Sequence, residues 1–214
     1  NVENIITMAK IIILGIFIAY GLKRIFQIPS EAAASFTPFL PNGAGGVVIA
    51  MGLTFIAFEG YDLIATVAEE IKAPEKTIPR ATLISLSVTV FIYLMILLVC
   101  IGAIQPESGK SWQFLGQYQE TAIARAAQSF MPSIGVVLII FGGLLSTISA
   151  LNATILASSR VAFSMSRDKM LPVSLSTIHT QRRTPHVAIA VTGVIVIVMA
   201  LLFPIQVIGS AASV

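Results

Sequence analysis

The sequence has few charged side chains, one cysteine and two histidines among its 214 residues. Charged residues make up 11% of the chain, whereas soluble domains carry about 25%, so an ordinary soluble domain is excluded. The lone Cys100 cannot form an internal disulfide. No metal-spaced His/Cys cluster, phosphate-binding glycine loop or nucleophile elbow is present, so we expect neither an enzyme, a cofactor nor a metal site. A net charge of +3, with no basic patch interleaved with aromatics, argues against nucleic acid.

Apolar residues dominate what remains, at 56% of the chain. A membrane-spanning helix needs about 20 apolar residues in succession. Five runs are close to this length, and they predict spans at about residues 2–28, 47–68, 81–104, 132–160 and 187–203. Pro74 and Pro79 separate the second span from the third, and the tail from Ile205 begins either a loop or a sixth span. The sequence therefore predicts an all-α, polytopic transmembrane helix bundle over residues 1–214.

The distribution of lysine and arginine predicts the orientation of this bundle, because cytoplasmic loops carry an excess of both. The segments after the second and fourth spans hold eight basic residues: Lys72, Lys76, Arg80, Arg160, Arg167, Lys169, Arg182 and Arg183. The opposite side holds four: Lys23, Arg24, Lys110 and Arg125. We therefore expect the first set to face the cytoplasm.

Two carboxylates, Glu59 and Asp62, interrupt the second apolar run with Gly60 between them. Counted from Val47, Glu59 lies about 18 Å into a hydrocarbon core of about 30 Å. Charges at such depth face protein or a water-filled cavity. We interpret the interruption as a broken helix near residues 57–61, whose free backbone groups bind a solute. The alternative is a pair of carboxylates near the interface that are only solvated.

Lys10 is a second charge inside an apolar run. It can extend its stem back to the membrane surface, or it can face the interior of the bundle. Burial favours the neutral form of a lysine, so in the second case Lys10 can gain and lose a proton during a cycle. Ser146 and Ser149 of the fourth run lie at overlapping depths and offer hydroxyl oxygens, although such residues also serve simply to pack helices.

Two motifs resemble a known family. The first is FEGYDLIAT at residues 58–66, followed by EEIKAPEKTIPRA at 69–81; the second is ASSRVAFSMSRDKMLP at 157–172. Together they resemble amino acid permeases of the amino acid-polyamine-organocation (APC) superfamily. The resemblance covers essentially the whole chain, and Ala73 stands where the family usually has asparagine.

The resemblance implies the leucine-transporter fold, with two inverted repeats of five spans each. The chain would correspond to spans five to ten, so the N-terminal spans, including the glycine-rich partner of the break, would be missing. The substrate would contact the break, which comprises Ala57, Phe58, Glu59, Gly60 and Tyr61. Lys10 looks like the span-five lysine that replaces a sodium ion in some proton-coupled members, with Ser146 and Ser149 as its partners.

The function implied is secondary active transport of amino acids across the cell membrane by alternating access, with a proton as the candidate coupling ion. The partners would be an amino acid, the proton, the lipid bilayer and the missing spans. Two alternatives stay open. One is an amino acid or polyamine exchanger, in which Glu59 and Asp62 face a cationic substrate. The other is a membrane sensor that has the transporter fold without moving solute.

Overall fold

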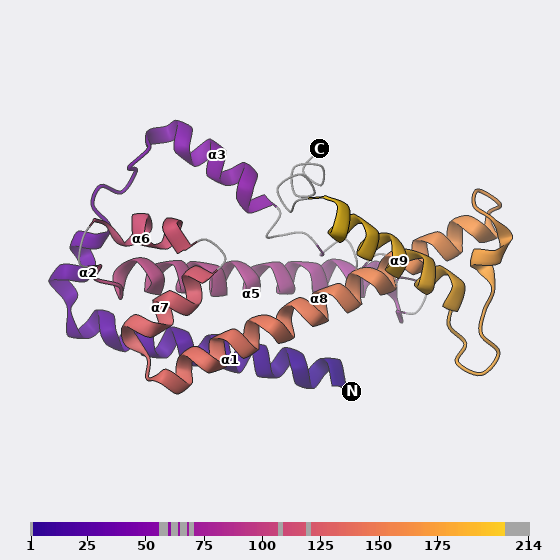
Figure 1. Cartoon of the computed structure of the whole chain (residues 1–214), viewed down its shortest axis with the longest axis horizontal. Coiled ribbons are helices and arrows are strands. Elements are labelled where there is room, and N and C mark those ends of the chain that lie inside the picture. Colours follow the sequence, from indigo (N-terminus) through magenta and orange to yellow (C-terminus); the bar gives the residue numbers. More distant parts are fainter. Residues whose placement is uncertain are drawn as a thin grey trace. The chain divides into compact units, whose positions relative to one another are not determined.

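The computed structural model describes residues 2–55, 60, 64, 68, 71–106, 109–118 and 121–203, and most of these residues lie in helices (Figure 1). The helices are α1 (Val2–Gln27), α2 (Pro29–Ser35), α3 (Gly43–Phe55), α5 (Pro74–Gly102), α6 (Ser111–Tyr118), α7 (Ala122–Phe130), α8 (Ser133–Arg167), the 3₁₀ helix η4 (Val173–Ser176) and α9 (His186–Leu202). The described part of the chain contains no strand, so the all-α prediction is confirmed.

Three helices are long and apolar enough to cross a membrane: α1 over Asn4–Gln27, α5 and α8. Shorter apolar helices occupy Gly43–Gly52 and His186–Leu202. Two helices extend well beyond the predicted spans at one end, because α5 begins at Pro74, before residue 81, and α8 continues to Arg167, past residue 160. The bounds of the membrane spans themselves stay a prediction. Proline is compatible with the first helical position, where the missing N–H has no intrahelical partner.

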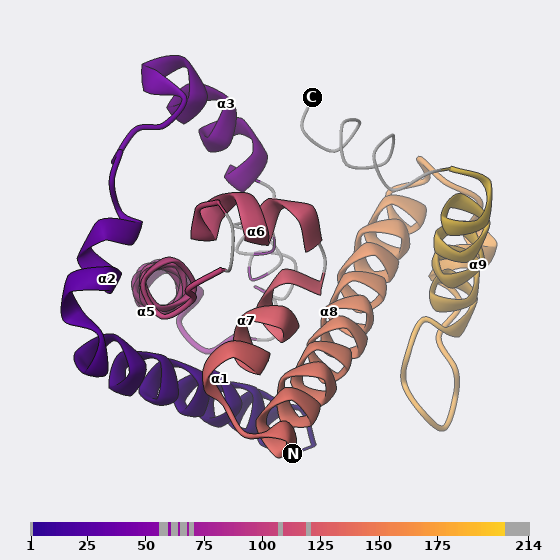
Figure 2. The same ribbon diagram turned by 60° about the vertical axis from the view of Figure 1, so that its left-hand side comes forward.

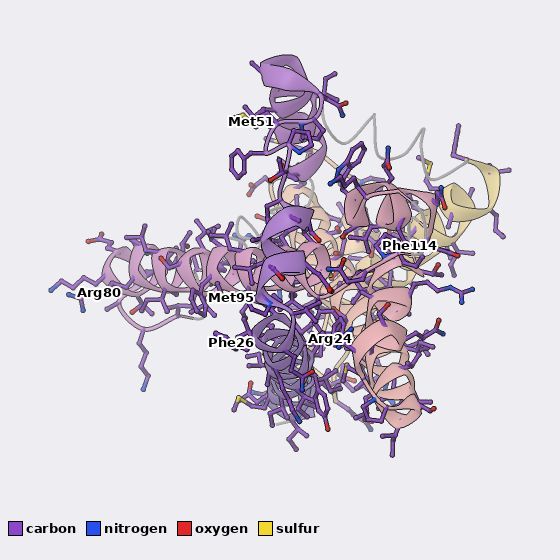
Figure 3. All side chains as sticks on the ribbon, turned by 90° about the vertical axis from the view of Figure 1, so that its left-hand side faces the viewer. Arg24, Phe26, Met51, Arg80, Met95 and Phe114 are labelled. Carbon is purple, nitrogen blue, oxygen red and sulfur yellow. The ribbon has the colours of Figure 1, made fainter. Side chains whose placement is uncertain are left out.

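The chain divides into two compact units, which we describe separately. Unit 1 comprises Asn1–Val47 and Ser87–Ser149; unit 2 comprises Val48–Leu86 and Ala150–Val214. Unit 1 contains the main hydrophobic cluster, built from nine buried residues: Phe17, Val99, Cys100, Ala103, Ile104, Ala126, Ala127, Met131 and Ile139. Much of the remaining apolar surface is exposed, as Phe26 of α1 illustrates at 80% (Figure 3).

Within unit 1, α1 packs against α7, and α7 packs against α6 (Figure 2). The rings of Phe17 and Phe130 meet edge to face, with centroids 5.2 Å apart. The buried Ser111 Oγ at the start of α6 donates a 3.0 Å hydrogen bond to the carbonyl oxygen of Ile104. Gln105 Nε2 donates to Ser35 Oγ at 3.3 Å, which connects this loop to the end of α2. These contacts hold the short helices against the long ones.

Unit 2 contains the end of α8, η4 and α9, and η4 packs against α9. The buried Ser166 near the end of α8 donates its hydroxyl hydrogen to the carbonyl oxygen of Pro172 at 2.7 Å. The loop before α9 is closed by a pair of backbone hydrogen bonds: His179 N to Thr184 O at 2.9 Å and Arg183 N to His179 O at 2.8 Å. The segment between α8 and α9 is therefore an ordered connection.

Candidate functional site

The predicted helix break begins just after the end of α3 at Phe55. Gly60 is the one member of the predicted substrate site that the structure describes, and it is a turn residue with φ of 101°. An α-helix requires φ near −63°, so the backbone at Gly60 is not α-helical. Ala57, Phe58, Glu59 and Tyr61, like Asp62, lie outside the described residues. The proposed contact between this backbone and a substrate stays a prediction.

Lys10 lies at a cavity of about 480 Å³ within unit 1. α1 contributes Lys10, Ile13 and Leu14; Thr121, just before α7, and Ile123 and Ala124 in its first turn also line the cavity. The rest of the lining comes from α8: Ile139, Ile140, Gly142, Gly143, Leu144, Ser146 and Thr147. Lys10 is half-buried and Ser146 is exposed. The structure thus brings Lys10 and Ser146 to one cavity, whereas Ser149 is half-buried on the same helix and is not part of the lining.

Two glycines of α8, Gly142 and Gly143, line this cavity. A Cβ atom at Gly142 would lie 3.1 Å from Ile13 Cγ2, so α1 and α8 approach closely at this point. A Cβ atom at Gly143 would meet nothing within 4 Å. Small residues allow such approaches between membrane helices. Gly142 therefore allows the close approach of the two helices, whereas Gly143 faces open space.

Hydroxyl groups at this cavity are suited to accept hydrogen bonds from an ammonium group. Thr147 Oγ1 donates to the carbonyl oxygen of Gly143 at 3.1 Å, and Thr121 Oγ1 donates to that of Tyr118 at 2.9 Å. Each hydroxyl hydrogen is used in this way, while the oxygen keeps lone pairs that can accept another bond. Lys10, with three donors when protonated, has the complementary chemistry. Lys10 and the hydroxyl oxygens that line this cavity are therefore chemically complementary.

Sequence reasoning missed Thr121 and did not assign Thr147 to the site. Thr147 was visible as a polar residue one position after Ser146 in an apolar run. Thr121 gave no such signal, because it precedes the short helix α7, whose packing against α1 is a tertiary contact. Among the described residues, no group of three or more His, Cys, Asp or Glu side chains is placed to hold a metal ion.

Comparison with known proteins places these features in a family. The family model described as "Amino acid permease" matches residues 1–213. The chain belongs to the amino acid permease family. An uncharacterised protein of Methanocaldococcus jannaschii is 34% identical over 79% of this chain and 37% of its own length. The branched-chain amino acid permease BcaP of Bacillus subtilis is 33% identical over 88% of this chain and 38% of its own length.

A third relative is named for a different solute. The methylthioribose transporter of Bacillus subtilis is 27% identical over 90% of this chain and 39% of its own length. The chain therefore spans less than two fifths of the length of these curated relatives. Relatives with functional names are named as permeases and transporters rather than enzymes, in agreement with the resemblance and with the apolar helices. This chain is part of a polytopic helical membrane protein.

Proposed function

We propose that the complete protein carries amino acids across the cell membrane by alternating access. The observation that carries this proposal is the match to the amino acid permease family over residues 1–213. A relative named as a branched-chain amino acid permease, 33% identical over 88% of the chain, favours amino acids over other solutes. The apolar helices α1, α5 and α8 supply the spans that such a carrier needs.

The substrate binds at the interrupted helix that follows α3. The non-helical backbone at Gly60 supports this assignment, because a break at membrane depth frees backbone groups that a polar solute can satisfy. The backbone of residues 57–61 then contacts the α-amino group, and Phe58 or Tyr61 contacts the side chain. Glu59 has no assigned role in this scheme.

Protonation of Lys10 couples transport to the proton gradient. The shared cavity supports this, since Lys10 and Ser146 line it together. A protonated Lys10 donates to the hydroxyl oxygens of α8, and loss of the proton removes that attraction. The approach of α1 to α8 would then depend on protonation, which is the link that alternating access requires. Ser149 remains a candidate partner that does not line this cavity.

Uptake by the complete protein in proteoliposomes tests both parts of the proposal. Radiolabelled branched-chain amino acids are offered with and without an inward proton gradient, in the wild type, Lys10→Ala and Lys23→Ala. Lys23 is the matched control, because it is an exposed lysine on the same helix. We expect gradient-driven accumulation in the wild type and Lys23→Ala but only equilibration in Lys10→Ala. Uptake that is independent of the gradient and unchanged in Lys10→Ala would remove the coupling role.

The choice of substrate is tested separately by competition. Leucine, arginine, putrescine and methylthioribose are added in excess during leucine uptake, the last because a relative is named as a methylthioribose transporter. Competition by neutral amino acids alone supports the proposed substrate class. Strong competition by arginine or putrescine would favour an exchanger or polyamine carrier, and preloaded vesicles would then reveal exchange. Absence of uptake for every solute would support a sensor.

A further inference from the structure

The loop that leads from η4 to α9 (Figure 1) is closed by the backbone of one histidine. His179 N donates a hydrogen bond to Thr184 O at 2.9 Å, and Arg183 N donates to His179 O at 2.8 Å. The next bond, from His186 N to Thr184 O at 2.9 Å, leads directly into the first residue of α9. The entry to α9 therefore depends on the bonds that His179 makes.

The imidazole ring of His179 supports the same loop. Its Nδ1 atom accepts hydrogen bonds from the backbone amides of Gln181 and Arg182, at 3.3 Å each. A ring nitrogen accepts a hydrogen bond only when it carries no proton, so these bonds require the tautomer in which Nδ1 is bare. A charged ring has an N–H donor at both nitrogens and can accept neither amide. The side-chain hydrogen bonds of this loop are therefore incompatible with a charged His179.

The residue type at position 179 matters, because a side-chain acceptor in a turn does not have to titrate. Asparagine and aspartate commonly accept a hydrogen bond from the backbone amide two residues on, and they keep an acceptor between pH 5 and 8. Histidine does not, because its charge ordinarily changes within that range. With His179 as the acceptor, a common kind of turn becomes sensitive to protons.

A second histidine lies against the first. The rings of His179 and His186 meet edge to face, with centroids 5.4 Å apart. His186 is the first residue of α9, and the N-terminus of a helix disfavours positive charge. Histidine rings become charged over the same range of pH, and like charges this close repel one another. Acid therefore acts on the contact between the loop and α9 as well as on the hydrogen bonds of His179.

Other charged groups lie on the elements around the loop. Ile178, the neighbour of His179 in sequence, lines a cavity together with side chains of α8. Six titratable or charged side chains among the described residues lie at this cavity, in the loop or at the start of α9: Arg160, Arg167, Asp168, Arg182, Arg183 and His186. η4 has none, and Glu69 and Glu70 lie outside the described residues. Loss of the Nδ1 acceptor follows from the ring itself and requires no particular net charge around it.

We propose that the loop between η4 and α9 is a pH-sensitive switch, closed while His179 Nδ1 is bare and opened when the ring gains a proton. The direction follows from the hydrogen bonds: the loop is ordered at the upper end of the range in which histidine titrates, and this order is lost as the pH falls through that range. The distribution of lysine and arginine predicts that the loop faces the cytoplasm, so the switch would respond to the pH of that side. It is separate from the cavity at Lys10 and does not depend on which solute the protein carries.

Hydrogen exchange of the complete protein in nanodiscs tests the switch. Amide exchange in peptides that cover residues 177–186 is measured by mass spectrometry at about pH 5.5 and about pH 7.5, within the range in which histidine titrates. The rates are corrected for the intrinsic effect of pH on amide exchange. We expect the amides of Gln181 and Arg182 to exchange at least about fivefold faster in acid, which corresponds to the loss of one net hydrogen bond each. Equal protection at both pH values would overturn the proposal.

Asparagine provides the matched substitution, because its Oδ1 atom takes the place of Nδ1 and accepts hydrogen bonds without titrating. We expect His179→Asn to stay protected at both pH values. His179→Ala has no acceptor, so its loop should exchange about fivefold faster than that of the wild type even at the higher pH. His186→Asn is the control and should keep the pH response of the wild type. A response that persists in His179→Asn, or that disappears only in His186→Asn, would overturn the role of His179, as would full protection in His179→Ala.

A measurement on the wild type keeps the proposal testable if the variants misfold. Nitrogen-15 NMR of the labelled histidine rings, correlated with the backbone of His179, distinguishes a bare Nδ1 from a protonated one. We expect the protonation of this ring and the rise in amide exchange of the loop to have the same midpoint in pH. A protonated Nδ1 in a loop that is still protected from exchange would overturn the switch.

Discussion

Gly21 of α1 lies directly against the side chain of Val99 of α5, and Val99 is fully buried. A Cβ atom at Gly21 would lie 2.9 Å from Val99 Cβ, closer than side chains tolerate. Packing of this kind is a main source of attraction between membrane helices, because lipid tails are as apolar as the helices themselves. The close approach of α1 and α5 therefore requires a residue without a side chain at Gly21.

We predict that Gly21→Ala destabilises the complete protein by about 1–3 kcal/mol, the usual cost of overpacking a well-packed site. Gly15→Ala is the control on the same helix, since a Cβ atom there would meet nothing within 4 Å. Thermal unfolding in detergent, followed by a thiol-reactive dye at Cys100, compares the two variants. A Gly21→Ala variant as stable as Gly15→Ala would show that α1 and α5 can shift apart without loss.

A buried hydroxyl group connects α6 to the end of α5. Ser111 is 1% exposed, and its Oγ donates to the carbonyl oxygen of Ile104 at 3.0 Å. Ser111→Ala leaves that carbonyl without this donor, which costs about 1–3 kcal/mol. The measurement is the melting temperature beside that of Ser174→Ala, where the serine is exposed. Equal melting temperatures would mean that another donor replaces the hydroxyl.

The sequence predicted the helical membrane class well, because a run of about 20 apolar residues is typical of a membrane-spanning helix and few other structures can bury it. It was less informative about where helices begin. Pro74 and Pro79 were read as boundaries, yet α5 begins at Pro74 and includes Pro79. Pro74 occupies the first position, where proline is tolerated, and Pro79 forgoes one hydrogen bond. Glu75 in the first turn also favours this start through the helix dipole.

The candidate sites, like the helix bounds, were predicted only in part. Depth counting along two helices suggested Lys10 and Ser146 as neighbours, and both line one cavity. Counting could not separate Ser146 from Ser149, because the face that a helix presents depends on its rotation, which packing determines. The left-handed φ of 52° at Arg183 was not predicted, because it follows from the folded loop in which Arg183 N donates to His179 O. Residue spacing alone carries no information about such a loop.

Ser146 and Ser149 of α8 can be tested against one another. Ser146 lines the cavity with Lys10, whereas Ser149 does not. A hydrogen bond to a charged group contributes about 1.5–3 kcal/mol, so we expect Ser146→Ala to reduce proton-driven uptake at least about tenfold, with little change in Ser149→Ala. The measurement is the initial rate of leucine uptake as the proton gradient is varied. A larger defect in Ser149→Ala would place the coupling site elsewhere.

Gly60 should be intolerant of any side chain. Its φ of 101° is accessible to glycine but strained for other residues, and such strain costs about 1–3 kcal/mol. We predict that Gly60→Ala lowers both the melting temperature and leucine uptake. Gly52→Ala in α3 serves as the control, because its Cβ atom would meet nothing within 4 Å. Normal uptake in Gly60→Ala would argue against a functional break at this position.

Ala73 precedes α5 in a conformation that does not suit alanine. Its φ is 51°, and its carbonyl oxygen accepts hydrogen bonds from Lys76 N at 3.1 Å and Thr77 N at 3.0 Å. These bonds begin α5, so the backbone geometry is required while the side chain opposes it. The resemblance described above places asparagine at this position in the family, and asparagine adopts left-handed values several times more readily than most residues.

We therefore predict that Ala73→Asn and Ala73→Gly both stabilise the protein. The left-handed conformation costs a residue with a Cβ atom about 1–2 kcal/mol, and glycine removes this cost. Glycine also makes the unfolded chain more flexible, and this lowers the free energy of unfolding by about 0.4–1 kcal/mol. Asparagine avoids the entropy term, so it should raise the melting temperature at least as much as glycine does. Ala81→Gly, within the helix, should have the opposite effect and lose about 1 kcal/mol. If both Ala73 variants melt below the wild type, the left-handed conformation at this residue is not the one the protein adopts.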